Sequence, residues 1–390
     1  MIKLYKKMVL VLAICAAAAL AGVGYYSAVL PDQYIFEEGA PYSLQGDGCF
    51  SFRVLSGEDK PVAATGDDFF ADITCLGVKI KSVHLTQKQT TTLGVSGKPF
   101  GVKMLTDGVI VVGITSIKGV NAGELAGLQI GDVLLSAGGK PITGNDDLKA
   151  LAAVGKSISV TFVRNGIQKT AILTPVKDQN GSYKFGVWVR DSSAGIGTMT
   201  FVDLQNRQFG GLGHGITDTD TGQILPLQSG VAVQASIDGV QKGKTGTPGQ
   251  LKGTFYSDLM IGPVQSNTAC GLFGRLTGDL SGVTPYQTAP LSAIKRGDAQ
   301  ILSTVEGDTP KLYNIKILSV NYNKSKPGKN MVIRVTDKDL LAKTGGIVQG
   351  MSGSPIIQDG KLVGAVTHVL VNDPTRGYGI FIENMLDAAE

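Results

Sequence analysis

The sequence contains few histidines and few charged residues. Only three of the 390 residues are histidine, His84, His214 and His368, so any imidazole-based chemistry has three candidates. Charged residues make up 17%, below the usual quarter, and hydrophobic residues make up 43%, which excludes a highly charged disordered chain. Three lysines among the first seven residues supply most of the net charge of +4. The remainder is nearly neutral, which argues against a nucleic-acid-binding protein.

Cysteine is also scarce, whereas glycine is abundant. The four cysteines are Cys15, Cys49, Cys75 and Cys270, and no Cys-x-x-C pair occurs, which argues against structural zinc. Cys49 and Cys75 fall in one stretch and could pair in an oxidising compartment, although free buried thiols explain them equally well. The 53 glycines are about twice the ordinary usage and follow no Gly-x-y period, which excludes collagen.

The first thirty residues predict a membrane anchor. A lysine-containing start is followed by 22 uncharged residues, Met8 to Val29. At a rise of ~1.5 Å per residue this helix is about 33 Å long, enough to cross a ~30 Å hydrocarbon core. The lysines precede the helix, so the N-terminus should stay cytoplasmic and the chain after Pro31 should lie outside. We expect an uncleaved signal anchor (1–30) rather than a cleaved signal peptide.

Residues 31–92 and 93–178 predict two small β-rich units. The first contains short alternating segments and reads as a small β module, with His84 as a surface or half-buried strand residue. The second contains Val109–Ile114 and the stretch Ala126-Gly-Leu-Gln-Ile-Gly-Asp-Val-Leu-Leu135, and it resembles a PDZ domain. That resemblance implies a carboxylate-binding loop at Phe100, Gly101 and Val102, although the unit could instead pack on its neighbour without a ligand.

Residues 179–390 contain many short strand candidates and carry the most specific chemical motif. The strand spacing favours a β sandwich or barrel over an α/β fold. The motif Gly350-Met-Ser-Gly-Ser-Pro355, with the hairpin after it, resembles the nucleophile segment of chymotrypsin-like serine proteases. The resemblance makes Ser352 the nucleophile, with the Gly350 and Ser352 amides as an oxyanion hole. A plain Gly/Ser/Pro surface loop is the alternative, and Met351 replaces the aspartate used in chymotrypsin-type activation.

The nucleophile requires a base, and His214 is the preferred candidate. It lies between glycines in Phe209-Gly-Gly-Leu-Gly-His-Gly215 and precedes the serine, as in chymotrypsin-like proteases. His368 is the rival, on the strand that would form the wall of the P1 pocket. A metal site of His214 with Asp218 and Asp220 is an alternative, but aspartates in such a segment are usually turn residues.

The acid of a serine-protease triad cannot be chosen by position. The aspartates that qualify are Asp203, Asp218, Asp258, Asp298 and Asp337. An anchor, a PDZ-like unit, Gly-His-Gly-Ile, Val-Thr-Asp and Gly-Met-Ser-Gly-Ser-Pro, in this order, together resemble the SpoIVB peptidase family. The resemblance implies a Ser–His–Asp triad and assigns Asp337. This residue precedes Ser352 by only 15 positions, whereas the acid of double-barrel chymotrypsin-like enzymes lies much earlier.

The resemblance also implies a function. It predicts a mainly β, membrane-anchored serine endopeptidase of sporulation, without a cofactor or metal, with its peptidase domain at 179–390. It implies self-cleavage, a location in the forespore intermembrane space, and a protein substrate that is a membrane-bound regulator of an intramembrane metalloprotease. Cutting that regulator would activate a late sigma factor. A peptide C-terminus or the chain's own segment would occupy the PDZ unit. The competing hypothesis is a catalytically inactive membrane-tethered PDZ adaptor.

Overall fold

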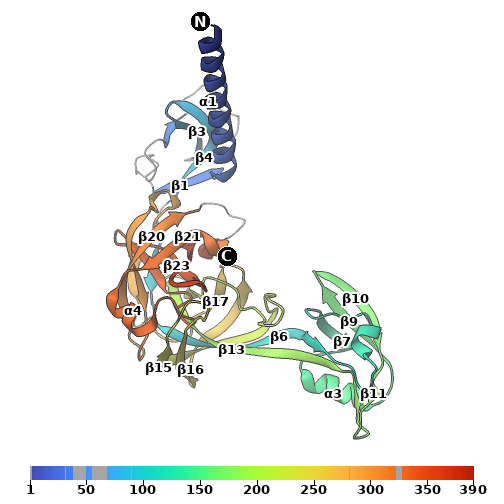
Figure 1. The fold of residues 1–390 in the computed structure, drawn as a ribbon. Helices are drawn as coiled ribbons and strands as arrows, with labels where there is room; N and C mark the ends of the chain where they lie inside the picture. The colour runs from blue at the N-terminus through green and yellow to red at the C-terminus, as the bar shows by residue number, and fades with distance from the viewer. Residues whose placement is uncertain are drawn as a thin grey trace.

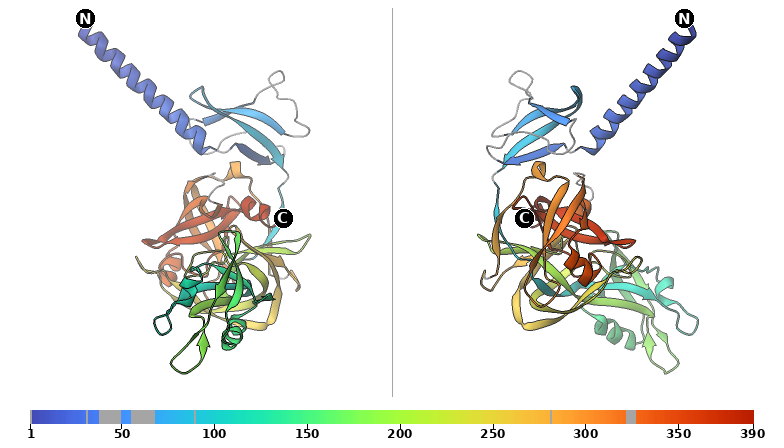
Figure 2. Two further views of the ribbon diagram at one scale, coloured as in Figure 1. Left: turned by 90° about the vertical axis from the view of Figure 1, so that its right-hand side faces the viewer. Right: turned by 60° about the vertical axis from the view of Figure 1, so that its left-hand side comes forward.

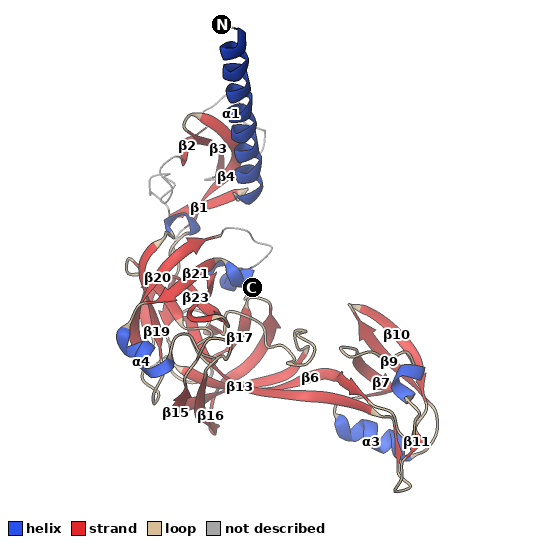
Figure 3. Cartoon of the chain, viewed as in Figure 1, coloured by secondary structure: helices blue, strands red, loops and turns tan. Residues whose placement is uncertain are grey.

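Strands make up most of the molecule. The structure is a computed structural model and describes residues 2–30, 32–37, 50–54, 68–88, 90–280, 282–321 and 327–390. Apart from the N-terminal helix, the helices in this part of the chain are short (Figure 3). The predicted mainly β fold class is therefore confirmed. Cys49 lies outside the described residues, so the choice between a disulfide with Cys75 and free thiols lies outside them too.

A long apolar helix begins the chain and points away from the rest of the molecule (Figure 1). Helix α1 (Ile2–Val29) contains the segment Lys6–Ala28, which has 23 residues and a mean hydropathy of 2.3. No part of its most apolar stretch is buried inside the structure. Since about 20 helical residues cross a hydrocarbon core, α1 is compatible with a single membrane anchor.

A small four-stranded sheet lies between α1 and the main body (Figure 2). Its strands are β1 (Gln33–Glu37), β2 (Phe50–Val54), β3 (Asp68–Cys75) and β4 (Val78–Lys88), in the order β1-β4-β3-β2. The Lys81 ammonium group donates to the carbonyls of Ser27 and Leu30 at 3.0 and 2.8 Å, which attaches the end of α1 to this sheet. His84 is half-buried on β4, as predicted, and its ring packs against Phe70.

The largest sheet contains the strands that build the first half of the main body. These strands are β5 (Thr92–Val95), β6 (Pro99–Ile114), β13 (Val187–Asp203), β14 (Gln208–Gly211), β15 (Leu227–Gln241), β16 (Gln250–Thr268), β17 (Gly271–Arg275) and β18 (Thr284–Gln287). Strands β6 and β13 pair along most of their length and form a long two-stranded ribbon that leaves the body (Figure 1).

A separate unit, which we call the inserted module (residues 106–190), is built on the far end of this ribbon. Its other elements are α2 (Ala122–Leu125), β7 (Val133–Ala137), β8 (Lys140–Pro141), α3 (Asn145–Ala153), β9 (Ile158–Arg164), β10 (Ile167–Leu173), β11 (Val176–Lys177) and β12 (Tyr183–Lys184). It has its own core, which includes Val109, Leu134, Leu148 and Phe162. The module therefore interrupts the large sheet between β6 and β13.

The predicted peptide-binding loop at Phe100, Gly101 and Val102 is wrong. These residues lie in the first half of β6, where Gly101 pairs with Ile196 of β13 on one side and with Val233 of β15 on the other. Phe100 and Val102 are buried in the core of the main body. Backbone groups paired on both edges are not available to a peptide carboxylate. The expected boundary between 178 and 179 also differs from the structure, because the strand before the inserted module already belongs to the main sheet.

The second half of the main body is a closed barrel. It comprises β19 (Gly297–Ser303), β20 (Lys311–Val320), β21 (Met331–Val335), β22 (Pro355–Gln358), β23 (Lys361–Leu370) and β24 (Asp373–Phe381), with η1 (Leu291–Ala293), η2 (Pro327–Lys329), α4 (Lys338–Thr344) and α5 (Ile382–Asp387). Its apolar interior includes Ile315, Ile333, Ile356 and Val366. The barrel packs on the large sheet, and the candidate site lies where the two meet.

Candidate active site

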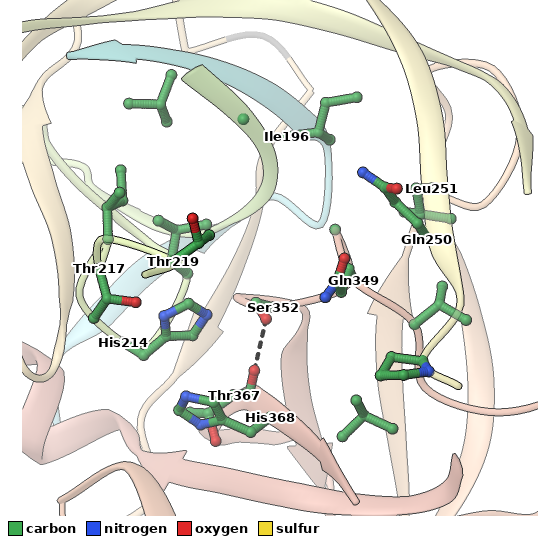
Figure 4. A pocket seen from close by; sticks show the side chains of 18 of the residues that line it. Ile196, His214, Thr217, Thr219, Gln250, Leu251, Gln349, Ser352, Thr367 and His368 are labelled. Carbon is green, nitrogen blue, oxygen red and sulfur yellow. Dashed lines mark hydrogen bonds between the residues drawn. The ribbon is translucent and has the colours of Figure 1, made fainter. Parts of the chain in front are cut away.

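A cavity of about 800 Å³ lies between the barrel and the large sheet. The barrel contributes Ser352 and His368, and the sheet and its loops contribute His214 and Ile196 (Figure 4). Two of the three predicted catalytic residues, Ser352 and His214, are thus brought together from distant parts of the chain. The rival base His368 lies in the same cavity.

The loop that carries Ser352 needs glycine at two points. It follows α4, which ends at Gly345 in the left-handed conformation (φ 75°). Gly350 and Gly353 have φ values of 98° and 93°, a region that other residues rarely adopt. A Cβ atom on Gly353 would also lie 2.0 Å from the carbonyl oxygen of Thr198. The glycines seen in the sequence motif therefore permit a close approach between this loop and β13.

Strand β13 holds the nucleophile loop through three hydrogen bonds. The Thr198 N–H donates to the Ser352 carbonyl at 2.9 Å, and its hydroxyl donates to the Gly350 carbonyl at 2.8 Å. The Thr200 hydroxyl donates to the Gly353 carbonyl at 2.7 Å. Both threonine side chains are buried, so water does not compete for these bonds. Sequence reasoning missed both threonines, because nothing local links β13 to a loop 150 residues later.

The predicted oxyanion-hole amides are free of backbone acceptors. Neither the Gly350 N–H nor the Ser352 N–H donates to a backbone carbonyl within the described ranges. The Leu251 N–H of β16 donates to the Gln349 carbonyl at 2.8 Å. Since a trans peptide points its C=O and N–H in opposite directions, this bond turns the Gly350 N–H away from β16. Two N–H groups separated by one residue in a tight loop can stabilise a developing oxyanion.

Ser352 and His214 are each bonded to a backbone carbonyl. The Ser352 hydroxyl donates to the Thr367 carbonyl at 2.6 Å. The Nδ1 atom of His214 is 2.8 Å from the Gly215 carbonyl oxygen. A carbonyl can only accept, so Nδ1 must carry the hydrogen and Nε2 is left as the acceptor, which is the tautomer that a general base requires.

The two imidazoles in the cavity are neutral near pH 7. The rings of His214 and His368 are 4.6 Å apart between centroids. Burial lowers the pKa of His214 below its usual value, and the bond to Gly215 opposes this effect. Burial, together with the neighbouring His214 and Lys329, lowers the pKa of His368 to about 4. A base must be unprotonated to accept a proton, so this environment favours His214 in its active form.

The structure does not bring Asp337 to the cavity. Its carboxylate caps α4, accepting hydrogen bonds from the N–H groups of Asp339 and Leu340 at 3.1 and 3.0 Å. It also accepts from the N–H of Asn314 at 3.2 Å. Asp337 is thus at one end of α4, and the loop with Ser352 follows the other end. Its assignment as the triad acid stays a prediction.

None of the other aspartates considered from the sequence lines the cavity either. Asp218 is buried and bound by Arg190 and by the N–H groups of Asp220 and Thr221. Asp203 accepts hydrogen bonds from two N–H groups in the turn after β13. Within the part of the chain that the structure describes, no group of three or more His, Cys, Asp or Glu residues could hold a metal ion.

A second cavity, of about 820 Å³, lies in the inserted module. One wall is helix α3, with Leu148 and Ala153, and the other is the start of β13, with Val187 and Val189. At one end is Phe185-Gly-Val187, a second copy of the tripeptide found at 100–102. Gly186 has a φ of 66°, and a Cβ there would lie 2.3 Å from the Thr115 carbonyl. Glycine therefore permits the close approach of this segment, which lies directly before β13, to Thr115 at the end of β6.

The chain is similar to one known protein family and to solved structures of low sequence identity. The family model described as SpoIVB peptidase S55 matches residues 181–386. A PDZ domain of an SdrC-like protein from Listeria monocytogenes is 18% identical, covers 21% of this chain and 87% of its own, and has a TM-score of 0.19. The Rv3671c protease in its inactive form is 14% identical, covers 50% of this chain and 84% of its own, and has a TM-score of 0.29. No curated protein matches the chain.

Proposed function

Because the chain belongs to the SpoIVB peptidase S55 family, we propose that it is a membrane-anchored serine endopeptidase in which Ser352 is the nucleophile and His214 the general base. The observation that carries this proposal is the shared cavity. Ser352 lies on a glycine-containing loop of the barrel and His214 on a glycine-flanked loop of the large sheet, and both face the same space. A serine beside a neutral imidazole is the usual arrangement for nucleophilic attack on an amide.

The chemistry follows the serine-protease sequence of steps. The Ser352 hydroxyl turns from the Thr367 carbonyl and attacks the scissile carbonyl carbon, while the His214 Nε2 atom accepts its proton. The Gly350 and Ser352 amides stabilise the oxyanion, which is worth about 2.7–4 kcal/mol per donor. His214 returns the proton to the leaving amine, and water then hydrolyses the acyl-enzyme by the same route.

The Gly215 carbonyl takes the orienting part that an aspartate plays in a triad. It accepts from the His214 Nδ1 atom and so fixes the tautomer. For Asp337 we propose a positioning role, since its carboxylate begins α4 and α4 leads into the nucleophile loop. This proposal differs from the direct contact that the family resemblance implied.

Labelling with a fluorophosphonate tests the nucleophile. The full chain in detergent should gain one adduct, located on Ser352 by peptide mass spectrometry. Ser352→Ala should gain none. Ser354→Ala is the matched control from the same loop, because the Ser354 hydroxyl is buried on Ser303, and it should still be labelled. A parent chain that is folded and never labelled would favour the inactive adaptor instead.

For the inserted module we propose peptide binding of the PDZ kind at the second cavity. Support comes from the N–H groups of Phe185 and Gly186, which have no backbone acceptor among the described residues and can bind a carboxylate. Lys149 and Lys184 also line this cavity but pair with Asp146 and Asp178. The positive charge of Lys118, a third lining lysine, favours an anionic chain end. Amidation of a bound peptide's C-terminus should therefore weaken binding.

The family resemblance supports the finer biological proposals. We propose that the part of the chain after α1 is extracytoplasmic and acts in the space between the two membranes around a forespore. Its substrate would be a membrane-bound regulator of an intramembrane metalloprotease, with self-cleavage releasing the peptidase from its anchor. In sporulating cells, a Ser352→Ala chain should remain full-length and membrane-bound, and the late sigma factor should stay inactive. Release of that variant would exclude self-cleavage.

A further inference from the structure

One strand lines both cavities. Residues Val187–Val189 of β13 form a wall of the cavity in the inserted module, and residues Ser193–Ile196 of the same strand line the cavity that contains Ser352. Strand β13 is continuous between the two (Figure 1), and β6 pairs with it on both sides of a register shift between Arg190 and Ser192. A polypeptide lying along β13 would therefore contact both cavities without leaving the strand.

The edge of β13 that faces these cavities is unpaired over this stretch. Strand β6 pairs with one edge from Val187 to Thr198, and β14 joins the other edge only from Met199 onward, as far as the described strands show. An unpaired strand edge presents a row of N–H and C=O groups that can bind an extended peptide.

The hydrogen bonds at Thr198 show which backbone groups face the catalytic cavity. The Met199 N–H bonds toward the β6 side, to Lys98, whereas the Thr198 N–H bonds on the opposite edge, to the Ser352 carbonyl. Because successive residues of a strand alternate, Ile196 and Ala194 present their N–H groups on the same edge as Thr198. The free edge of β13 thus leads directly to the nucleophile loop.

Side chains in the middle of β13 bind neighbouring loops. Arg190 forms ion pairs with Asp218 and Asp220, on the loop that follows His214. Asp191 accepts a hydrogen bond from the Asn145 N–H, at the start of α3, at 3.0 Å. The register with β6 shifts between Arg190 and Ser192. The unpaired edge of β13 is therefore divided into two segments, one beside each cavity. These contacts fix the distance between the two cavities along β13.

We propose, on the basis of the function proposed above, that β13 is a shared docking edge that sets the distance from a substrate's C-terminus to its cleavage site. The occupant is the substrate polypeptide itself. A carboxylate held at Phe185 and Gly186 fixes the C-terminal end, so the peptide runs antiparallel to β13 and its upstream residues reach Ser352. At ~3.3 Å per residue, the path from Gly186 to Thr198 spans about 40 Å, which predicts cleavage about 10–12 residues before the C-terminus.

A degenerate library of 20-residue peptides with free C-termini tests the proposal, since it requires no known specificity. The full chain in detergent should release C-terminal products whose lengths cluster at about 10–12 residues. Amidated C-termini should reduce this cluster about tenfold, the effect of losing roughly 1.4 kcal/mol of binding. Product lengths that are unrelated to the distance from the C-terminus would overturn the shared edge while leaving the peptidase intact.

Two matched variants separate the module cavity from general effects on folding. Ala153 lies on α3 and lines the cavity, whereas Ala150 is exposed on the same helix and does not. Ala153→Trp should fill the cavity and abolish the cluster of product lengths, and Ala150→Trp should preserve it. Equal effects of the two substitutions would contradict the proposal.

A binding measurement keeps this test independent of catalysis. Library peptides with a photoreactive phenylalanine at the second or the twelfth residue from the C-terminus are crosslinked to the Ser352→Ala chain. The first should react with α3 and the second with residues 347–352 or 367–371. If both positions react only with the inserted module, the shared edge is wrong. If the crosslinks are as expected but the parent chain cuts no peptide, the proposed peptidase activity fails instead.

Discussion

At the residue scale, the groups in the catalytic cavity take their orientation from the backbone. His214 donates to the Gly215 carbonyl and Ser352 to the Thr367 carbonyl, and no carboxylate lines the cavity in the described part of the chain. Both carbonyl acceptors survive any side-chain substitution. The serine must leave its carbonyl before it attacks, so the arrangement describes a resting site that a substrate has to rearrange.

The lowered pKa of His214 predicts an unusual pH profile. The base must be neutral, and a pKa below 6.5 in the folded chain keeps it neutral into mildly acidic solution. We expect kcat/KM for peptide cleavage to decline on acidification with a midpoint below pH 6.5, the ordinary value for histidine. A pH–rate profile of the full chain measures this. A decline centred at or above pH 6.5 would contradict the buried, neutral His214.

Asparagine and alanine at position 337 distinguish capping from catalysis. Asn is as good an N-cap as Asp, whereas Ala removes the cap at a cost of about 1 kcal/mol. Because these two caps differ little, we expect Asp337→Asn to keep activity within about threefold of the parent. We expect Asp337→Ala to lower the free energy of unfolding. Urea unfolding and peptide cleavage measure the two effects. A folded Asp337→Asn chain with activity reduced by orders of magnitude would restore Asp337 as the triad acid.

The sequence predicted the candidate catalytic residues that the structure brings into one cavity, because both lie in local patterns. Ser352 and His214 are each flanked by glycines, and such short motifs do not depend on the rest of the fold. The Gly215 carbonyl had no signal of its own, because every residue has a carbonyl. Phe-Gly-Val occurs twice, and the copy at 185–187 rather than that at 100–102 lies beside the cavity of the inserted module. The choice between them depended on strand pairing, which the tripeptide does not encode.

At the scale of elements, strand β13 positions the loop that carries Ser352. Its Thr198 and Thr200 hydroxyls bind the carbonyls on either side of Ser352, so the strand determines where the nucleophile loop lies. The same strand is tied at Arg190 to the loop after His214. Both side chains proposed as catalytic are therefore positioned relative to one strand.

Substitution of Thr198 tests this support. Thr198→Val keeps the shape but removes the hydroxyl and leaves the Gly350 carbonyl without this donor, at a cost of about 1–3 kcal/mol. We expect kcat to fall about tenfold or more, while Thr198→Ser, which keeps the hydroxyl, stays close to the parent. Steady-state kinetics on a cleaved peptide measures both. Equal activity of the Val and Ser variants would show that the hydrogen bond does not position the loop.

Arg190 is expected to contribute to stability through Asp218, whose side chain is fully buried. Arg190→Ala leaves a buried carboxylate without its cation, which typically costs about 3–5 kcal/mol. Asp218→Asn in addition should recover part of this loss, because the neutral amide needs no cation. Urea unfolding of the two single variants and the double variant gives the interaction free energy between Arg190 and Asp218. Strictly additive losses would mean that the ion pair does not stabilise the fold.

At the scale of the whole molecule, the chain is a peptidase body with a module inserted into its first sheet. Strand β6 pairs with β13 and β15, across sequence separations of about a hundred residues, and such non-local pairing leaves no trace in periodicity. The sequence therefore predicted the strands and the two fold types but assigned 93–105 to the wrong unit. The long apolar N-terminal helix was predictable because length and hydropathy alone define it.

Mass spectrometry of the chain's own N-termini shows whether the chain is a serine endopeptidase that acts through Ser352. The full chain and its Ser352→Ala variant are purified in detergent, incubated in parallel and analysed for new N-termini. The parent should accumulate one or more internal N-termini with time, and the variant should stay intact while remaining folded by circular dichroism. The same new N-termini in both chains, or none in a folded parent, would contradict the account.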